Sequence, residues 1–235
     1  MSGDLLPYLD DVVPVFPLPN LVVFPRAVQF LHIFEKRYRL MCKHLLERED
    51  DQRLIAMAHL KPGYYAKYHT NWAEIDPTAC VALVVKHECL PDGRYNLLIR
   101  GLCRARVRRE IRDGAYRLAW LEGLPEAGTP SEPPDHIRLK QALHEAVRKP
   151  ALASLPCGRF CRDLFDSDLH LGALADLLAF HLLPLEQDAV KQIMLEELNA
   201  ASRAEVLLKE MHAFGRKLEV ASRTTNGWPP LNYAN

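Results

Sequence analysis

Two pairs of side chains with metal-binding or redox chemistry stand out in this 235-residue chain. His87 and Cys89 are two residues apart in a segment of strand-like composition, so they share one face and would bind zinc if two more ligands joined them. Cys157 and Cys161 lie in CGRFC, and their spacing of four fits neither a thioredoxin-type pair nor a standard zinc knuckle. No C-x-x-C motif supplies further ligands. We therefore expect no metal site and no cofactor, and ordinary structural roles for these four residues.

The sequence lacks the signatures of nucleotide hydrolysis and of a serine nucleophile. A phosphate-binding loop needs G-x-x-x-x-G-K-[ST], in which backbone N–H groups and a lysine hold the phosphates, and the chain contains no such motif. It also contains no G-x-S-x-G elbow to expose a serine at the start of a helix. We therefore expect a chain without catalytic machinery.

Arginines alternate along one predicted strand at Arg104, Arg106 and Arg108, so their guanidinium groups are expected to share a face. Such a face could follow a phosphate backbone and bind RNA. The 30 basic and 30 acidic residues cancel, however, which leaves no net field to attract nucleic acid or an anionic membrane. A solvated strand face is the alternative. We expect RNA to be the less favoured partner and a membrane to be no partner.

Aromatic residues gather in the polar segment GYYAKYHTNWAEID, at Tyr64, Tyr65, Tyr68 and Trp72. Tyrosine and tryptophan combine a large apolar surface with a polar group, which suits them to anchor a bound peptide. The polar residues between them make full burial of the segment costly. The alternative is that the four rings pack within the core of the sheet. We predict a peptide-binding surface formed by these aromatics.

Prolines and short apolar runs dominate the string FPLPNLVVFPRAVQFLHIFEKRY. Proline lacks an N–H and restricts the residue before it, so each proline belongs at a strand end, an edge or a turn. We predict buried strands at residues 21–24 and 27–33. The apolar period then changes to that of a helix, with one face formed by Phe34, Tyr38, Met41, Cys42 and Leu45.

A β-hairpin is predicted farther along the chain. Residues 80–90 and 94–107 are rich in apolar and β-branched residues, and they flank the turn pair Asp92-Gly93. Gly101 interrupts the second run and predicts a β-bulge, which bends a strand around a barrel. Alternating apolar residues from Tyr116 to Trp120 predict a further strand.

The strings FPLPNLVVFP and LHIFEKRYR resemble the opening of the Lon protease N-terminal domain, and HECLPDGRYNLLIRGLCRARV resembles a segment typical of the same family. The string LGALADLLAFHLLPLEQDAVKQIMLEELNAASRAEVLLKEM resembles its helical part. The resemblance implies an α+β fold in which a PUA-like pseudobarrel of mixed strands precedes a helical bundle. Two positions depart from the family: Arg26 replaces the usual small residue or glycine, and Phe30 replaces the usual proline.

We predict two subdomains joined by a linker. Residues 1–124 form the β-rich PUA-like part, and residues 125–134, rich in proline, form the linker. Residues 135–223 form the α-helical bundle, with helices over 135–149, 168–183 and 185–199, and with a fourth helix that begins at a capping box from Ser202 to Glu205. Residues 224–235 are expected to form a flexible tail.

The start of the chain and its cysteines indicate a cytosolic protein. MSGDLLPYLDDVV lacks the basic segment and apolar core of a secretory signal, and no run of 18 apolar residues occurs anywhere. In the cytosol the six cysteines are expected to be reduced.

The resemblance implies a non-catalytic, protein-binding module, since the corresponding domain of Lon recognises substrates. Its expected partners are unfolded or exposed apolar segments of other polypeptides, and it would act as an adaptor or accessory in protein quality control, beside a separate ATPase or protease. The alternative is a PUA-like RNA-binding protein that uses the face of Arg104, Arg106 and Arg108. Salt separates the two hypotheses, because RNA binding weakens steeply as salt rises whereas apolar peptide contacts persist.

Overall fold

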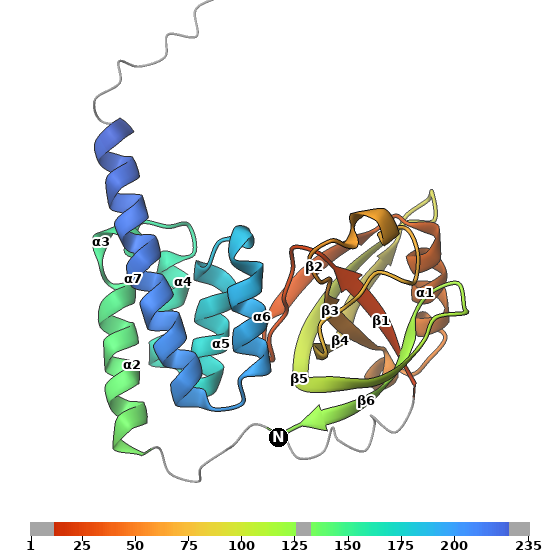
Figure 1. Cartoon of the computed structure of the whole chain (residues 1–235), viewed down its shortest axis with the longest axis horizontal. Coiled ribbons are helices and arrows are strands. Elements are labelled where there is room, and N and C mark those ends of the chain that lie inside the picture. The colour runs from red at the N-terminus through yellow and green to blue at the C-terminus, as the bar shows by residue number, and fades with distance from the viewer. Residues whose placement is uncertain (1–11, 126–132, 226–235) are drawn as a thin grey trace, which may run out of the picture. The chain divides into compact units, whose positions relative to one another are not determined.

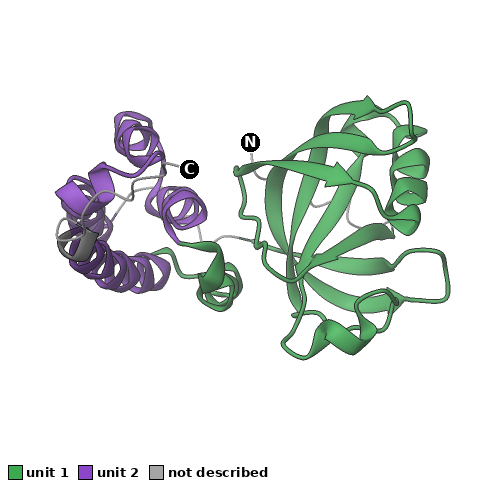
Figure 2. Cartoon of the chain, turned by 90° about the horizontal axis from the view of Figure 1, so that it is seen from above, with its two compact units in different colours: residues 1–128, 184–200 green, residues 129–183, 201–235 purple. Residues whose placement is uncertain are grey.

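The computed structural model describes residues 12–125 and 133–225, in which the strands precede residue 125 and most of the helices follow it (Figure 1). Its contacts divide the chain into two units (Figure 2): unit 1 comprises residues 1–128 and 184–200, and unit 2 comprises residues 129–183 and 201–235. Among the described residues, no helix is both long enough and apolar enough to cross a membrane.

Unit 1 contains a sheet whose six described strands have the order β2-β5-β4-β3-β1-β6. The strands are β1 Val13–Leu18, β2 Val28–Ile33, β3 Leu54–His59, β4 Thr78–Cys89, β5 Tyr95–Ile111 and β6 Leu118–Leu124. β1 and β3 are parallel, and the other pairs are antiparallel. The long strand β5 pairs with β2 near its start and with β6 near its end, so the sheet curves back on itself. The expected pseudobarrel of mixed strands is confirmed.

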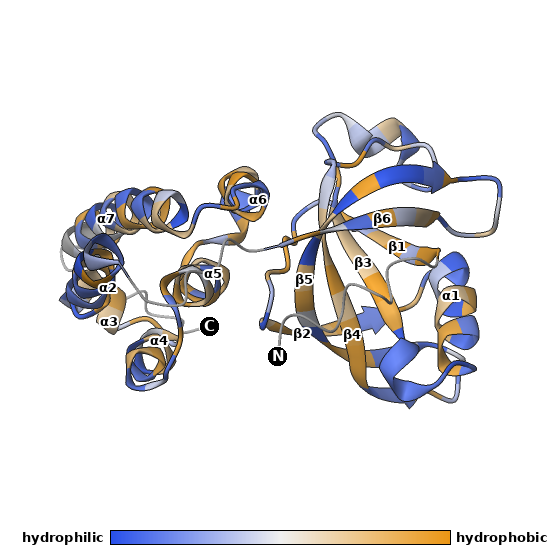
Figure 3. Ribbon diagram, turned by 90° about the horizontal axis from the view of Figure 1, so that it is seen from below, coloured by the Kyte–Doolittle hydropathy of each residue, from blue (hydrophilic) through white to orange (hydrophobic). Residues whose placement is uncertain are grey.

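The interior of unit 1 is lined by apolar residues of the central strands, which carry the orange, hydrophobic colour in Figure 3. β3 has the sequence LIAMAH and is buried at all six positions. A strand covered on both faces loses the apolar–polar alternation of a half-exposed strand. β3 was not predicted from the sequence, because its short apolar run lacks the alternation of a half-exposed strand.

The predicted hairpin joins β4 to β5 through the Asp92-Gly93 turn. Gly93 has a φ of 77°, which glycine adopts without the steric cost that a Cβ brings. The Leu90 N–H donates to the Arg94 carbonyl over 2.8 Å, and the Gly93 N–H donates to the Leu90 carbonyl over 2.8 Å. Local sequence chemistry therefore predicted this turn correctly.

The predicted bulge at Gly101 is also present. Val81 pairs with Cys103 and Ala82 pairs with Gly101, so β5 contains one extra residue between them. A Cβ at position 101 would clash with the Phe24 carbonyl, because the loop before β2 crosses β5 at this point. The Arg26 N–H donates to the Gly101 carbonyl over 2.8 Å, and the Gly101 N–H donates to the Ala27 carbonyl over 2.9 Å.

The prediction of a strand at residues 21–24 is wrong. These residues form an irregular segment, and the preceding strand is β1, Val13–Leu18. Val22, Val23 and Phe24 are buried, so their apolar character reflects packing and not a β-ladder. β1 tolerates Pro17 because β6 pairs with β1 only at Val13 and Pro14.

The strand at residues 27–33 is confirmed by β2, but its predicted burial is only half right. Leu31 and Ile33 face the interior, whereas Val28, Phe30 and His32 are exposed on the other face. The helix that follows is α1, Lys36–Leu46, and its buried face contains Tyr38, Met41, Cys42 and Leu45 as predicted. Phe34 precedes this helix and is exposed, so it does not belong to that face.

Unit 2 is helical. Its described elements are α2 Pro134–Val147, α3 Pro150–Ala153, α4 Gly158–Asp163, η4 Leu164–Asp166, α5 Leu171–Leu182 and α7 Ala200–Thr225. α5 is buried along nearly its whole length, and its Asp176 forms a buried ion pair with Arg203 of α7 at 3.2 Å. α7 begins at Ala200, so Ser202 lies in its first turn and the predicted capping box is two residues late.

Residues 184–200 depart from the predicted bundle of residues 135–223, because they pack in unit 1. They form η5 Leu185–Gln187 and α6 Asp188–Glu196. The Gln192 side chain donates to the Thr78 carbonyl over 3.0 Å, and Arg104 Nε donates to the Leu195 carbonyl over 2.9 Å. These bonds hold α6 to the barrel. Residues 126–132 of the predicted linker and residues 226–235 of the predicted tail lie outside the described residues.

Candidate functional site

The predicted aromatic cluster, Tyr64, Tyr65, Tyr68 and Trp72, lies in the connection between β3 and β4. The connection includes the short helix η3, Tyr64–Lys67, which follows Gly63 with a φ of 87°. Tyr65 is 78% exposed and Trp72 is 54% exposed. Tyr64 and Tyr68 are half-buried and pack against the barrel core. Two of the four aromatics therefore attach the segment to the barrel, and two face solvent.

The three tyrosines form a continuous group of rings. The Tyr64 and Tyr65 rings are stacked with centroids 4.3 Å apart, and the centroids of Tyr64 and Tyr68 are 5.8 Å apart. Trp72 instead lies beside Arg112, whose guanidinium carbon is 5.4 Å from the indole centroid. The structure thus joins the tyrosines and places Trp72 next to a cation, an arrangement that sequence spacing did not predict.

Arg37 of α1 holds the backbone of the aromatic cluster. Its guanidinium donates to the Tyr68 carbonyl over 2.9 Å and to the Thr70 carbonyl over 2.9 Å. Glu35 forms an ion pair with Arg37 at 3.0 Å and so orients the guanidinium. Charge-assisted bonds of this kind restrain a segment more firmly than neutral ones. The exposed rings are therefore presented on a restrained segment, which lowers the entropy cost of binding.

The phenol groups of Tyr64 and Tyr68 stay protonated at neutral pH, because the pKa of each is raised. Burial, followed by the negative charge of Glu35, raises the pKa of Tyr68. The hydrogen bond with Tyr65 is the largest cause that raises the pKa of Tyr64. Both hydroxyls remain uncharged, so they can donate hydrogen bonds to the carbonyl groups of a bound chain.

A second exposed apolar surface was missed by the sequence analysis. Phe30 of β2 is 56% exposed and Phe34 is 62% exposed, and Val28 points to the same side of β2 as Phe30. β2 ends the strand order of the described sheet. The alternation of Val28, Phe30 and His32 with inward residues could have revealed this surface. We call Val28, Phe30 and Phe34 the β2 surface.

Comparison with known proteins decides the family of the chain. The family model described as the ATP-dependent protease La (LON) substrate-binding domain matches residues 12–213. The chain belongs to this family. The resemblance predicted from the opening, hairpin and helical strings is confirmed, and the chain contains a substrate-binding module of the LON type.

Curated relatives of this LON domain are Lon proteases. The chain is 30% identical over 213 residues to Lon protease 2 of Sorangium cellulosum strain So ce56. The aligned region covers 89% of this chain and 25% of that protein. It is 27% identical over 217 residues to Lon protease 2 of Myxococcus xanthus, which covers 90% of the chain and 24% of that protein. The chain therefore spans about a quarter of the length of these relatives.

Solved structures share the fold of this LON domain. The N-terminal domain of Mycobacterium avium complex Lon protease has a TM-score of 0.64 and 16% identity, and the match covers 86% of this chain and 98% of that one. The Lon N-terminal domain protein from Xanthomonas campestris has a TM-score of 0.61 and 21% identity, with 85% and 98% covered. The expected α+β class, with a PUA-like pseudobarrel followed by helices, is confirmed.

The predicted arginine face of the LON domain is not a continuous exposed surface. Arg104 is only 2% exposed and its guanidinium bonds to α6. Arg108 forms an ion pair with Glu122, and Arg106 is exposed. A second register shift between Val107 and Arg109 also breaks the alternation of β5. A β-bulge adds one residue to a strand, so the side chains after it point to the opposite face from the one that simple alternation predicts. Alternation in the sequence therefore could not place the three guanidinium groups.

The candidate metal and cysteine residues of the LON domain form two separate pairs, His87 with Cys89 in unit 1 and Cys157 with Cys161 in unit 2. His87 and Cys89 are exposed near the end of β4, and no group of three or more potential ligands forms among the described residues. The Cys157 thiol donates to the His181 carbonyl over 3.2 Å. Burial, and after it the neighbouring Cys157, raises the pKa of Cys161 to about 12. The Cys161 thiol is therefore protonated and weakly nucleophilic at neutral pH.

Proposed function

We propose that this chain binds exposed apolar segments of other polypeptides through the aromatic cluster and performs no catalysis itself. The observation that carries the proposal is the exposure of Tyr65 and Trp72 on a segment held by Arg37. Exposed aromatic surface on a restrained backbone is the arrangement found at binding hot spots. Membership of the LON substrate-binding family supports the class of ligand.

Packing within the barrel, which was the alternative role for these aromatics, accounts for Tyr64 and Tyr68 only. Both pack against apolar residues of the core, whereas Tyr65 stacks on Tyr64 and is 78% exposed. We infer that Tyr64 and Tyr68 fix the platform and that Tyr65 and Trp72 contact the bound segment. A bound apolar side chain would then remove both exposed rings from water, which is favourable.

The proposed role is that of an adaptor or accessory in protein quality control. The family match concerns a substrate-binding domain, and the relatives named above are Lon proteases. We propose that the domain holds an unfolded segment while a separate ATPase or protease acts on it. A cytosolic location remains a prediction.

The test compares wild-type protein with the double variant Tyr65→Ala/Trp72→Ala. Binding of fluorescently labelled β-casein, which has no stable fold, is measured by fluorescence anisotropy. We expect the double variant to bind at least about fivefold more weakly, which corresponds to the ~1 kcal/mol scale of an interface anchor. Its melting temperature should be almost unchanged, because both rings are exposed.

Two matched variants give this test its controls. Phe160→Ala removes an exposed aromatic ring in unit 2 and should leave casein binding unchanged. Phe30→Ala/Phe34→Ala removes the rings of the β2 surface. If only that variant binds weakly, the polypeptide-binding function stands and the site moves to the β2 surface. Equal affinity in all variants, or a collapsed melting temperature in the Tyr65/Trp72 variant, contradicts the assignment, because truncating a buried aromatic costs about 3–5 kcal/mol.

RNA binding, the second hypothesis, has less structural support. It required three neighbouring exposed guanidinium groups, and the structure buries Arg104 and pairs Arg108. The anisotropy assay separates the hypotheses when it is repeated between 50 and 500 mM salt. Casein affinity that persists supports apolar contact, whereas tight binding to a labelled single-stranded RNA that weakens steeply with salt supports the alternative.

A further inference from the structure

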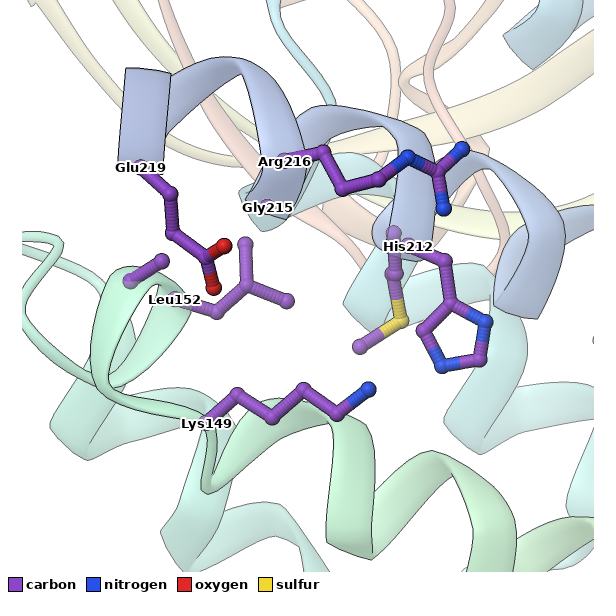
Figure 4. A pocket seen from close by; sticks show the side chains of 8 residues that line it. Lys149, Leu152, His212, Gly215, Arg216 and Glu219 are labelled. Atoms are coloured by element: carbon purple, nitrogen blue, oxygen red, sulfur yellow. The ribbon is translucent and has the colours of Figure 1, made fainter. Parts of the chain in front are cut away.

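Unit 2 contains a pocket that the proposed polypeptide binding does not use (Figure 4). It lies between the start of α3 and residues 211–219 of α7 and has a volume of about 330 Å³. Its lining comprises Lys149, Ala151, Leu152, Met211, His212, Gly215, Arg216 and Glu219. The volume is at the lower end of the range for small-molecule sites, so it fits a ligand of roughly ten non-hydrogen atoms.

Gly215 keeps the pocket open. Glycine inside a helix lowers helix stability relative to alanine, so its presence there calls for a reason. Close packing does not supply one: a Cβ at position 215 would meet only Leu152 Cγ, at the ordinary contact distance of 4.0 Å. The missing side chain instead leaves a hollow above the buried residues Leu152 and Met211, which form an apolar floor.

One end of the pocket is basic. Figure 4 shows the Lys149 side chain extending toward His212, with Arg216 one turn farther along α7. Among the residues that the structure describes, no carboxylate lies within ion-pair distance of the Lys149 or Arg216 side chain. Burial, followed by the charges of Lys149 and Arg216, lowers the pKa of His212. An anion placed here would neutralise this repulsion and would favour protonation of the imidazole.

The other end of the pocket differs in charge. Glu219 lies one turn beyond Arg216, and its carboxylate points toward Leu152 in Figure 4. A ligand with negative charge at both ends would be repelled by it. The lining therefore selects a molecule that has one anionic group and an apolar body.

We propose that this pocket binds a small amphipathic anion, whose phosphate or carboxylate group contacts Lys149, His212 and Arg216 and whose apolar body lies on Leu152 and Met211. The Gly215 hollow admits the apolar body. Glu219 orients the ligand with its anionic group toward His212. This site is separate from the aromatic cluster, so the proposal does not depend on polypeptide binding.

The test follows the imidazole resonances of His212 by NMR in the full chain. The probes are inorganic phosphate, phenyl phosphate and uncharged benzyl alcohol. We expect phenyl phosphate to bind at least about threefold more tightly than inorganic phosphate, because the apolar floor favours the ring. Phenyl phosphate should also raise the pKa of His212, and benzyl alcohol should not. The exposed His87 of unit 1 serves as the reference imidazole.

Four variants locate the site. Arg216→Gln should weaken phenyl phosphate binding about tenfold, the scale of a lost charge-assisted contact. Lys217→Gln removes the same charge from the next position of α7, outside the pocket lining, and should leave binding unchanged. Glu219→Gln should strengthen binding. Gly215→Leu should abolish binding by filling the hollow, and it should retain the fold because leucine favours a helix more than glycine does.

Opposite results would overturn the proposal. It is wrong if phenyl phosphate shifts His87 as much as His212, since that pattern indicates nonspecific ion association. It is also wrong if a folded Gly215→Leu variant binds as tightly as wild type, or if Lys217→Gln and Arg216→Gln weaken binding equally. A helical circular dichroism spectrum establishes the fold of each variant.

Discussion

At the scale of single residues, Arg26 adopts a backbone conformation that suits glycine. Its φ is 69°, and Arg26 is the one non-glycine residue with a positive φ in the described part of the chain. The conformation is imposed by the crossing of β5, where the Arg26 N–H bonds to Gly101. The resemblance to the LON family implied a small residue or glycine at this position. The strained backbone gives that preference a physical reason.

Arg26→Gly is therefore expected to stabilise unit 1. Glycine relieves the left-handed strain, and the gain is partly offset by the greater entropy of the unfolded chain. We expect the free energy of unfolding to rise by about 0.5–1 kcal/mol. The measurement is the urea midpoint at constant m-value.

Arg26→Ala is the control for this substitution, because alanine removes the guanidinium but keeps the Cβ that causes the strain. It should be no more stable than wild type. If the glycine and alanine variants have the same urea midpoint, the backbone explanation for position 26 is wrong.

At the scale of secondary-structure elements, α6 is attached to the barrel by polar bonds at several points. Gln192 of α6 donates a hydrogen bond to the Thr78 carbonyl of β4, and Arg104 of β5 donates one to the Leu195 carbonyl of α6. His59 Nε2 of β3 lies 3.2 Å from the Asp188 carboxylate at the start of α6. The other ring nitrogen of His59 lies 2.8 Å from Asp76. Arg104 would be costly to bury without its carbonyl partner, so α6 and β5 stabilise each other.

Lys191 of α6 makes this attachment dependent on pH. Burial lowers its pKa from 10.5 to about 8, and the acidic residues Asp188 and Glu186 oppose the shift only in part. The folded chain therefore loses the proton at lower pH than the unfolded chain does. The cost of charging Lys191 is fully present below pH 8 and disappears as the pH rises toward 10.5.

We expect Lys191→Met to be more stable than wild type near pH 7, by up to about 3 kcal/mol. The difference should shrink between pH 8 and 10, where folded wild type becomes neutral at this position. The measurement is urea unfolding of both proteins at pH 7, 8.5 and 9.5.

The difference between the two proteins is the meaningful quantity in this experiment, because other groups titrate in the same range. Burial raises the pKa of Cys42 to about 12 and that of Cys103 to about 11, which lowers wild-type stability above pH 9. Both proteins keep these cysteines, so their effect cancels. A difference that stays constant across the pH range contradicts the role given to Lys191.

At the scale of the whole molecule, we predict that the purified chain neither hydrolyses ATP nor cleaves unfolded casein. Its sequence has no phosphate-binding loop to hold the phosphates of ATP and no G-x-S-x-G elbow to present a nucleophilic serine to a peptide bond. The measurements are phosphate release and gel analysis of casein over several hours, beside a vector-only preparation. Turnover that disappears when a residue of this chain is mutated contradicts the prediction.

Local signals predicted much of the fold. The Asp92-Gly93 pair located the hairpin, Gly101 located the bulge, and apolar spacing located the buried face of α1. These features depend on backbone preferences and side-chain periodicity within a few residues, which are present in the sequence itself. The candidate aromatics were also found locally, since tyrosine and tryptophan in a polar segment need no distant contact to be noticed.

Interactions between distant residues account for the errors. Residues 21–24 have strand composition but are buried as an irregular segment, and β1 is the strand of this region that pairs with β3. Phe30 is exposed although its strand was expected to be buried. Arg104 alternates with Arg106 and Arg108 in sequence, yet α6 covers it from more than eighty residues away.

The amino-acid order alone was sufficient for the family, the α+β class, the hairpin and the lack of nucleotide-hydrolysis motifs, because each depends on residue types at short, ordered spacings. The packed chain decided which aromatics face solvent, which arginine is buried, and that residues 184–200 pack in unit 1. It also decided that Lys149 and His212 border one pocket, although 63 positions separate them. Burial and charge proximity arise only when distant segments exclude water from one another, so no local pattern contains them.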